Sequence, residues 1–392
     1  MMEYMTAGES HGEQMTGIIM GIPAGLEIDV DKINLALSIR QNSYGRGKRQ
    51  KIENDEVRIV SGIRGGITLG SPISVVVENK DHKNWLGIME TNSENIRYGE
   101  RYASKVVTCP RPGHADLVGG MKYGHRDLRN VLERSSARET VLKVAIGSIC
   151  EQLLRELKID LIGYVTQVGN IKIKTSEKMS VGDIRERIND NDLRIIDKSK
   201  ISEIHKLITQ TKRKGDTLGG KVRVLVENLP VGLGNYTSWE KKLDVRLAGA
   251  VMGVNAIKGV SFGDGFDIVG HFGSEVMDEI TYKPSGGYTR KTNHLGGIEG
   301  GMTNGMPLIV DAALKPIPTL RKPLETIDIE TRKRAKASIE RADITVVAPA
   351  SLIVENVIAI ELVRTILETF ESSNLSRLKV EVENYRNYIS RY

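Results

Sequence analysis

The chain has 392 residues, of which 40% are hydrophobic and 27% charged, which is enough for one large domain or for two or three smaller ones. The formal net charge of +6 favours anionic partners, whereas an aromatic content of 5% argues against broad stacking surfaces for nucleic-acid bases. Two cysteines, Cys109 and Cys150, form no CxxC pair, which excludes a disulfide framework or zinc ribbon and suits a reducing cytoplasmic compartment.

Short β-branched runs bounded by Gly, Pro or Asn alternate with helical patterns along the chain. In chain order they predict a strand at 17–22, a helix at 29–41 capped by Asp29 or Asp31, strands at 57–63 and 71–79, helices at 136–157 and 200–213, a strand at 221–230, a helix at 238–255, a strand at 306–314, and helices at 327–341 and 350–372. Because these elements follow no regular βαβ order, we expect an α+β fold rather than a doubly wound sheet.

The longest apolar window covers residues 345–362, but Pro349, Glu355 and Asn356 interrupt it, so no membrane span is expected. No Pro- or Ser-rich linker divides the chain. The 40 glycines cluster in polar segments that are typical of loops. The longest of these segments, 285–305, is expected to be functional or disordered because long structureless loops are uncommon in compact domains.

Several familiar site motifs are missing from the sequence. There is no GxGxxG triplet after a strand, so no dinucleotide fingerprint is present. The segment 215–222 has the glycines and the lysine of a phosphate loop, but Val222 stands where a magnesium-binding hydroxyl is required. The sequence has neither an HExxH motif nor paired His/Cys spacing, so no metal is expected.

Two histidines stand out because each lies in a polar turn that contains glycine. His11 lies in "GESHG", next to Ser10, and His114 lies in "RPGHAD", between Arg111 and Asp116. A histidine beside charged groups can be tuned in either direction across neutral pH. These two imidazoles are therefore the candidates for proton transfer.

Arginines gather in three further polar segments of the sequence. Arg40, Arg46 and Arg49 lie in a Gly-rich loop, and Arg134 and Arg138 flank Ser135 and Ser136 before the long helix, while Arg341 and Asp343 precede a late strand. Guanidinium groups grip phosphates and carboxylates, and a helix N-terminus binds anions. The residues alone thus indicate a small polyanionic substrate and elimination or proton-transfer chemistry.

Two other classes of function remain open from the residues. A basic nucleic-acid-binding protein would suit the charge and the Arg/Gly loop, but the aromatic residues for base stacking are few. A serine hydrolase could use Ser10 or Ser136 with His114, although no GxSxG elbow supports it.

Long motifs in a fixed order resemble the chorismate synthase family. They are "GESHG", "GRGxRxxxExD" (45–55), "RPGHADxxxxxKY" (111–123), "DxRxxxERSSARET" (127–140), "NAIKGVxFGDGF" (255–266), "GGIEGGMTNGMP" (296–307), "KPIPT" (315–319) and "RAD" (341–343). The resemblance covers residues 6 to about 364. It departs from the family at Thr217, which keeps the hydroxyl of the usual serine, and at Ala342, where relatives often carry histidine.

The resemblance implies an anti 1,4-elimination of phosphate and a ring proton from 5-enolpyruvylshikimate 3-phosphate to give chorismate, the last step of the shikimate pathway to aromatic amino acids. It implies reduced FMN as the cofactor without net redox change, with NADPH acting only indirectly through flavin reduction. Some members of the family reduce FMN themselves and most depend on an external flavin reductase or on anaerobic conditions; the missing dinucleotide fingerprint favours an external reductase here. It also implies a cytoplasmic homotetramer, no nucleic-acid or membrane partner, and a sandwich of antiparallel sheets enclosing helices. We expect one catalytic domain over 1–392, with 372–392 as a C-terminal extension of unknown role.

The same resemblance assigns roles to residues. His11 would be the acid toward the leaving phosphate, assisted by Ser10; His114 would protonate or face the anionic flavin, and Asp343 would be the base that relays the ring proton through flavin N5. The expected substrate-binding residues are Arg40, Arg46, Arg49, Arg111, Arg138 and Arg341. The expected FMN-binding residues are Arg134, Ser135, Ser136, Asn255, Ala256, Gly300, Lys315, Pro316, Ile317, Pro318, Thr319 and Arg341. Segments 43–55 and 285–301 are expected lids.

Overall fold

The computed structural model describes residues 2–46, 54–175, 179–284, 287–340 and 343–392. The strands are β1 (Glu3–Ala7), β2 (Gln14–Met20), β3 (Val57–Ser61), β4 (Ile63–Arg64), β5 (Ile67–Thr68), β6 (Ile73–Glu78), β7 (Asp160–Val168), β8 (Ile171–Lys172), β9 (Gly220–Glu227), β10 (Ile257–Phe262), β11 (Ile280–Lys283), β12 (Gly287–Arg290), β13 (Ile298–Glu299), β14 (Met302–Thr303), β15 (Leu308–Leu314), β16 (Glu325–Ile327) and β17 (Arg334–Lys336). The helices are α1 (Val30–Gln41), α2 (Glu100–Ala103), α3 (Asp116–Tyr123), α4 (Arg129–Ser135), α5 (Thr140–Glu156), α6 (Val181–Asn189), α7 (Ile201–Lys214), α8 (Leu243–Met252), α9 (Gly273–Val276), α10 (Val347–Thr369) and α11 (Leu375–Ser390).

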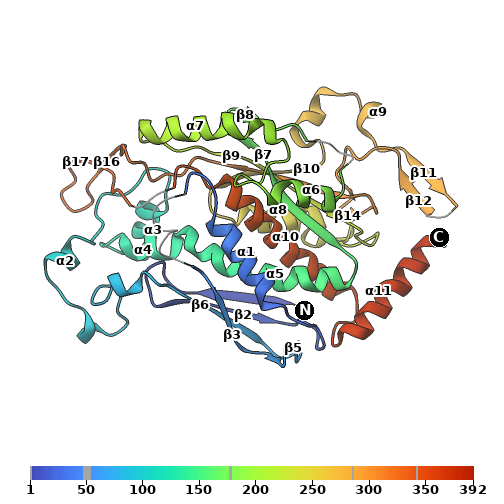
Figure 1. Ribbon diagram of the computed structural model, residues 1–392, viewed down its shortest axis with the longest axis horizontal. Coiled ribbons are helices and arrows are strands. Elements are labelled where there is room, and N and C mark those ends of the chain that lie inside the picture. Colours follow the sequence, from blue (N-terminus) through green and yellow to red (C-terminus); the bar gives the residue numbers. More distant parts are fainter. Residues whose placement is uncertain (1, 47–53, 176–178, 285–286, 341–342) are drawn as a thin grey trace.

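Two antiparallel sheets enclose a layer of helices (Figure 1). The smaller sheet has the strand order β1-β2-β6-β3, and the larger has the order β10-β15-β9-β7-β8. Helices α1, α5 and α10 pack against one another between the sheets, while α6 covers the outer face of the larger sheet. This arrangement confirms the predicted α+β sandwich, in which each sheet buries one apolar face against helices.

Helix α10 is the centre of the core. It is buried along nearly its whole length, because it contacts α5 and α1 on one side and strands β7 and β9 on the other. Two glycines permit this close packing. A Cβ on Gly147 of α5 would lie 2.4 Å from Cβ of Asn356, and one on Gly163 of β7 would lie 2.2 Å from the carbonyl oxygen of Ser351.

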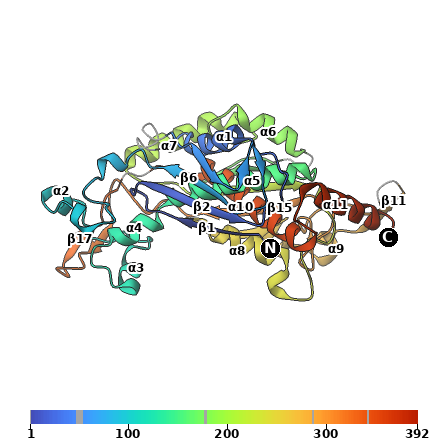
Figure 2. The ribbon, with the colours of Figure 1, turned by 90° about the horizontal axis from the view of Figure 1, so that it is seen from below.

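Different helices and hairpins lie at the two ends of the molecule. Helices α2 and α3 lie with the β16–β17 hairpin at one end, while α9 and the β11–β12 hairpin lie at the other (Figures 1 and 2). Helix α11 packs back on the body through Leu375, Leu378 and Val382, which belong to the main apolar core. None of the helices described by the structure is long and apolar enough to cross a membrane.

Most predicted elements are present within a few residues of their predicted limits. Helix α1 is capped by Asp29, whose Oδ1 accepts hydrogen bonds from the backbone nitrogens of Asp31 and Lys32 at 3.0 and 3.2 Å. The predicted helix at 238–255 is α8, and the one at 350–372 is α10, which begins three residues earlier than expected. Elements without a counterpart among the predicted ones include β1, β7, β10, α4, α6 and α11.

The predicted helix at 327–341 is wrong. Its described residues instead form the second half of a hairpin in which β16 pairs with β17. The side chain of Asp328 explains the difference, because its Oδ1 accepts hydrogen bonds from the backbone nitrogens of Glu330 and Thr331 and so stabilises a turn. Arg332 completes the turn in the left-handed region, with φ of 59°.

Candidate active site

A cavity of about 620 Å³ lies beside the junction of α4 and α5. Its walls come from the β1–β2 connection, the segments 81–85 and 105–115, the end of α1, the segment 314–319 and the first turns of α10. The volume falls in the range of small-molecule sites. Segments far apart in the sequence thus meet around a single space.

Most of the predicted site residues line this cavity. They are Ser10, His11, Arg40, Arg46, Arg111, His114, Ser135, Ser136, Arg138, Asn255, Ala256, Lys315, Ile317, Pro318, Thr319 and Asp343. Arg49 and Arg341 lie outside the described residues. The cavity therefore unites the candidate acid, the candidate base and the candidate flavin-binding segment.

Three predicted residues are not among those that line the cavity. The guanidinium of Arg134 is exposed and donates to the carbonyl oxygens of Thr6 and Gly8, so it braces strand β1. Gly300 lies in the turn between β13 and β14, and Pro316 lies between two residues that do line the cavity. The described residues of the expected lid at 285–301 also lie outside the lining.

The turn that carries His11 is held from both sides. Gly8 has φ of +118°, and a Cβ there would lie 2.6 Å from the carbonyl oxygen of Gln14, so the turn requires glycine. The amide of Asn79 donates to the carbonyl oxygens of Glu9 and Gly12 at 3.1 and 2.8 Å. The backbone around the imidazole is therefore fixed before any ligand binds.

The imidazole of His11 contacts a buried carboxylate and an indole. Its Nδ1 lies 2.8 Å from Oε1 and 3.0 Å from Oε2 of Glu133, and its backbone nitrogen donates to Oε2 at 2.8 Å. Its ring stacks on Trp85 with centroids 3.9 Å apart. Beside it, the hydroxyl of Ser136 donates to the hydroxyl of Ser10 at 3.1 Å.

His114 has a matching arrangement built from nearby residues. Its Nδ1 lies 2.6 Å from Oδ1 of Asp116, and the guanidinium of Arg111 binds the same carboxylate and donates to the Thr319 hydroxyl at 2.8 Å. Burial alone would raise the pKa of Asp116, but hydrogen bonds from His114 and Arg111 and the charge of Arg111 hold that pKa well below its usual range. Asp116 is therefore a carboxylate at neutral pH.

Two of the arginines share one buried carboxylate. Arg138 donates to Oδ2 of Asp55 at 2.7 Å, and Arg40 lies 3.5 Å from the same oxygen. Both side chains are buried, which orients their guanidinium groups at the cavity wall. Arg46 forms an ion pair of 2.7 Å with Asp343, so the candidate base has a cationic neighbour.

The segment 315–319 forms the opposite wall. Lys315 donates to the carbonyl oxygen of Gly113, and its pKa is lowered by partial burial and by nearby Lys258. The hydroxyl of Thr217 donates to the carbonyl oxygen of Ile317 at 2.8 Å. Thr217 stands where the family usually has serine, and the hydroxyl that both residues carry supports this segment. Ala256 adopts φ of 71°, a conformation rare for a residue with a side chain.

No role was predicted for Glu133, Arg129 and Trp85, which hold His11 in its turn, or for Asp55, although Glu133, Arg129 and Asp55 lie in quoted motifs. Arg129 and Glu133 lie on one helix. Their i, i+4 spacing on a helix was the available signal for an ion pair, and they do form one at 3.2 Å. The sequence does not indicate that this ion pair contacts His11, because that contact forms only in the tertiary structure.

The buried arginines also bear on the alternatives. Arg40, Arg111 and Arg138 are turned into the protein, whereas a nucleic-acid-binding surface presents its cations to solvent. The hydroxyl proton of Ser136 is directed to Ser10, which does not match the serine–histidine pair of a hydrolase.

The fold and the cavity define an α+β enzyme that gathers arginines and imidazoles around one cavity. The family model described as chorismate synthase matches residues 2–367. Chorismate synthases from Lactiplantibacillus plantarum and Enterococcus faecalis are 57% and 51% identical to the chain, each over 100% of both sequences. A crystal structure of a chorismate synthase has a TM-score of 0.81 at 35% identity and covers 100% of this chain and 99% of that one. The chain belongs to the chorismate synthase family and is a lyase of that type.

Proposed function

We propose that the chain converts 5-enolpyruvylshikimate 3-phosphate to chorismate by anti 1,4-elimination of phosphate and a ring proton. The observation that carries this proposal is the gathering of His11, His114 and Asp343 around one cavity together with arginines. An elimination needs an acid at the leaving group and a base at the proton, and both kinds of group are present. The family membership established above supports the same reaction.

His11 would serve the departing phosphate. Because Nδ1 is directed to Glu133, the imidazole would give its proton from Nε2 to a phosphate oxygen. Protonation lowers the charge of the leaving group and so the barrier to its departure. The hydroxyls of Ser10 and Ser136, hydrogen-bonded to each other, would orient the phosphate beside this nitrogen.

Asp343 would accept the ring proton at its carboxylate. Its ion pair with Arg46 keeps the carboxylate in place before substrate binds. Arg40, Arg111 and Arg138 would bind the two carboxylates and the phosphate of the substrate, since their guanidinium groups are already oriented by buried acids. Such preorganisation reduces the cost of ordering when an anion binds.

The residues of the cavity fit FMN. Asn255 and Lys315 would provide polar donors for phosphate and ring edges, and Ser135, whose hydroxyl donates to the carbonyl oxygen of Val131, also lines the cavity. An apolar wall for a planar ring comes from Leu132, Val254, Leu314, Ile317, Pro318, Ile339, Val346, Pro349, Ala350 and Ile353. Reduced FMN bound there would supply electron density that assists the loss of phosphate. His114, held by Asp116, would place its imidazole against the anionic edge of that ring.

We further propose one catalytic domain acting as a cytoplasmic homotetramer, with an external reductase using NADPH to reduce FMN. Both Cys109 and Cys150 are free thiols, which suits a reducing compartment. The assembly and the reductase rest on the family resemblance.

The first experiment is anaerobic. Pure protein is mixed with 5-enolpyruvylshikimate 3-phosphate and photoreduced FMN, and chorismate absorbance and phosphate release are followed together. Stoichiometric formation of both products, absent with oxidised FMN, would support the reaction and the cofactor. Folded protein that binds FMN but forms neither product would overturn the proposal. Adding NADPH with oxidised FMN then tests whether the chain reduces flavin unaided.

A further inference from the structure

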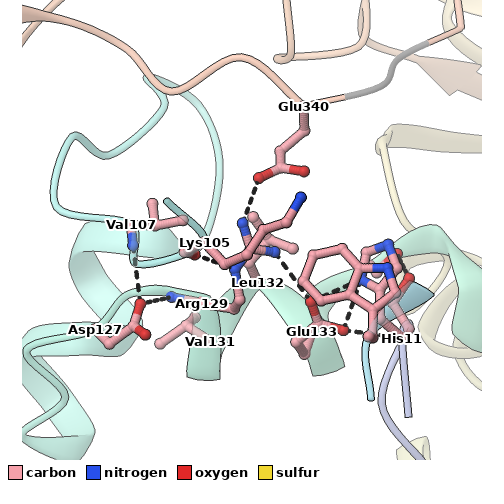
Figure 3. A network of polar contacts seen from close by, with 12 residues as sticks. His11, Lys105, Val107, Asp127, Arg129, Val131, Leu132, Glu133 and Glu340 are labelled. Atoms are coloured by element: carbon pink, nitrogen blue, oxygen red, sulfur yellow. Dashed lines mark hydrogen bonds and ion pairs between the residues drawn. The ribbon is translucent and has the colours of Figure 1, made fainter. Parts of the chain in front are cut away.

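A buried polar network connects His11 with the segment that precedes Asp343 (Figure 3). Its central member is Glu133 of α4, whose side chain is 1% exposed. The guanidinium of Arg129 bridges two carboxylates, donating to Glu133 at 3.2 Å and to Glu340 at 2.7 Å. The network thus begins at the candidate acid and ends three residues before the candidate base.

Glu133 is ionised at neutral pH. Burial alone would raise its pKa, but hydrogen bonds from the ring and backbone of His11 and the charge of Arg129 hold the pKa below its usual value. A carboxylate can only accept hydrogen bonds, so the proton between the two side chains resides on Nδ1 of His11. Such a contact fixes both the tautomer and the orientation of an imidazole.

We propose that Glu133 is a positioning residue that keeps His11 protonated at Nδ1 and assigns proton exchange with the substrate to Nε2. Arg129 maintains the carboxylate in that role. The inference rests on the proposed function, because it takes His11 to be the acid for the leaving phosphate. It assigns to Glu133 a role through His11, without contact to substrate.

The remaining contacts fix the ring plane. Trp85 stacks on the imidazole at an interplanar angle of 26°, and its own indole Nε1 donates to Asp81 at 3.3 Å. Nδ1 of His82 lies 3.0 Å from the backbone oxygen of His11. The imidazole is therefore held at its edge by a carboxylate and on its face by an indole.

The charges around His11 are of both signs. Glu133 is the anion in contact with the ring, while Arg129 and Lys105 lie over Trp85 at 4.9 and 4.7 Å from its ring centroid. Glu340 binds the far side of Arg129, and Asp81 binds the indole. Replacing Glu133 by glutamine removes the contacting anion and leaves both cations, so the charged imidazole becomes less favourable.

The test measures His11 directly, without turnover. Histidine C2 hydrogen–deuterium exchange, read by mass spectrometry across pH, gives a titration midpoint for each histidine. Glu133→Gln is expected to move the His11 midpoint to lower pH by about 1 pH unit. Glu133→Asp keeps the charge and is expected to stay close to wild type. Glu330→Gln is the matched control, because Glu330 pairs with Arg126 at the surface.

A second variant predicts the opposite sign. Arg129→Gln removes a cation that faces Trp85 and Glu133. The hydrogen bonds from His11, which lower the pKa of Glu133 more than the charge of Arg129 does, remain, so Glu133 stays ionised and the His11 midpoint is expected to rise. This variant, with Glu133→Asp, decides the question if Glu133→Gln does not fold. A Glu133→Gln midpoint equal to that of Glu330→Gln, or a fall in Arg129→Gln, would overturn the assignment.

Activity separates this inference from the proposed reaction. In Glu133→Gln, the alkaline limb of the kcat profile is expected to move to lower pH with KM nearly unchanged, because substrate contacts remain. A shifted His11 midpoint in a protein that makes no chorismate would support the positioning role and overturn the reaction. An unshifted midpoint overturns the positioning role whatever the activity.

Discussion

The cavity holds two histidines in the same manner, but their partners come from very different distances along the chain. His114 uses Asp116, two residues away, with Arg111 as the bridging cation. His11 uses Glu133, which is 122 residues away on α4, with Arg129 as the bridging cation. In both cases a buried carboxylate contacts Nδ1 and an arginine binds the same carboxylate.

The difference teaches what each histidine depends on. The support of His114 is local and can form as soon as its turn forms. The support of His11 requires the β1–β2 connection to meet α4, so it exists only in the folded enzyme. We therefore expect substitutions of the residues that support His114 and of those that support His11 to differ in how far their effects extend through the molecule.

The largest expected effect is loss of either imidazole. His11→Ala is expected to lower kcat by about 10²–10⁴-fold, because the proton for the leaving phosphate is lost. His114→Ala is expected to lower turnover and also to weaken FMN binding, because we place this residue against the flavin. Chorismate formation and fluorescence titration of FMN measure the two effects. Wild-type turnover in His11→Ala, or unchanged FMN affinity in His114→Ala, would remove the corresponding role.

The next largest effect is expected when Asp116, the local partner of His114, is replaced. Asp116→Asn leaves the buried guanidinium of Arg111 without its carboxylate, and we expect a loss of about 3–5 kcal/mol in the free energy of unfolding at neutral pH. Because the folded pKa of Asp116 is depressed, its contribution is present above the unfolded pKa of about 4 and is lost as pH falls further.

Urea unfolding of wild type and Asp116→Asn at a series of pH values checks this expectation. The difference between the two proteins should be constant above about pH 4 and should shrink at lower pH. A difference independent of pH down to the acid limit would show that the ionised carboxylate is not the source of the stability.

The smallest expected effect lies at the outer end of the network that supports His11. Glu340→Gln removes a half-buried partner of Arg129, whose other carboxylate, Glu133, remains. We expect a loss of about 1 kcal/mol or less in unfolding free energy and a change in kcat of no more than about threefold. Urea unfolding and steady-state kinetics measure both. A loss of kcat equal to that in Glu133→Gln would mean that Glu340 acts on the site directly.

The same contrast between local and distant partners explains how much the sequence predicted. The Arg111, His114 and Asp116 cluster was visible because its members lie in one short motif. The function of Glu133 could not be predicted, because its contact with His11 joins two elements that lie 122 residues apart in the sequence. The arginines were predicted as anion ligands, but the shared carboxylate of Asp55 appears only after folding.

The fold shows the same division. The helix α5, which has a clear apolar period, and the strand β6, which is a β-branched run, were predicted close to their limits. The hairpin at 325–336 was not, because one Asp328 side chain outweighs a weak helical pattern. Helix α11 carried no site motif and was left unpredicted, although Asn374 caps it by accepting from the nitrogen of Ser376 at 2.9 Å.

The close packing at Gly147 and Gly163 has a consequence for the width of the cavity. Pro349, Ala350 and Ile353 project into the cavity from the first turns of α10, and that helix rests on the backbone of its neighbours at both glycines. A single methyl group at either glycine would displace the helix, and with it that wall of the cavity. Two interior glycines that do not line the cavity thereby help to determine its width.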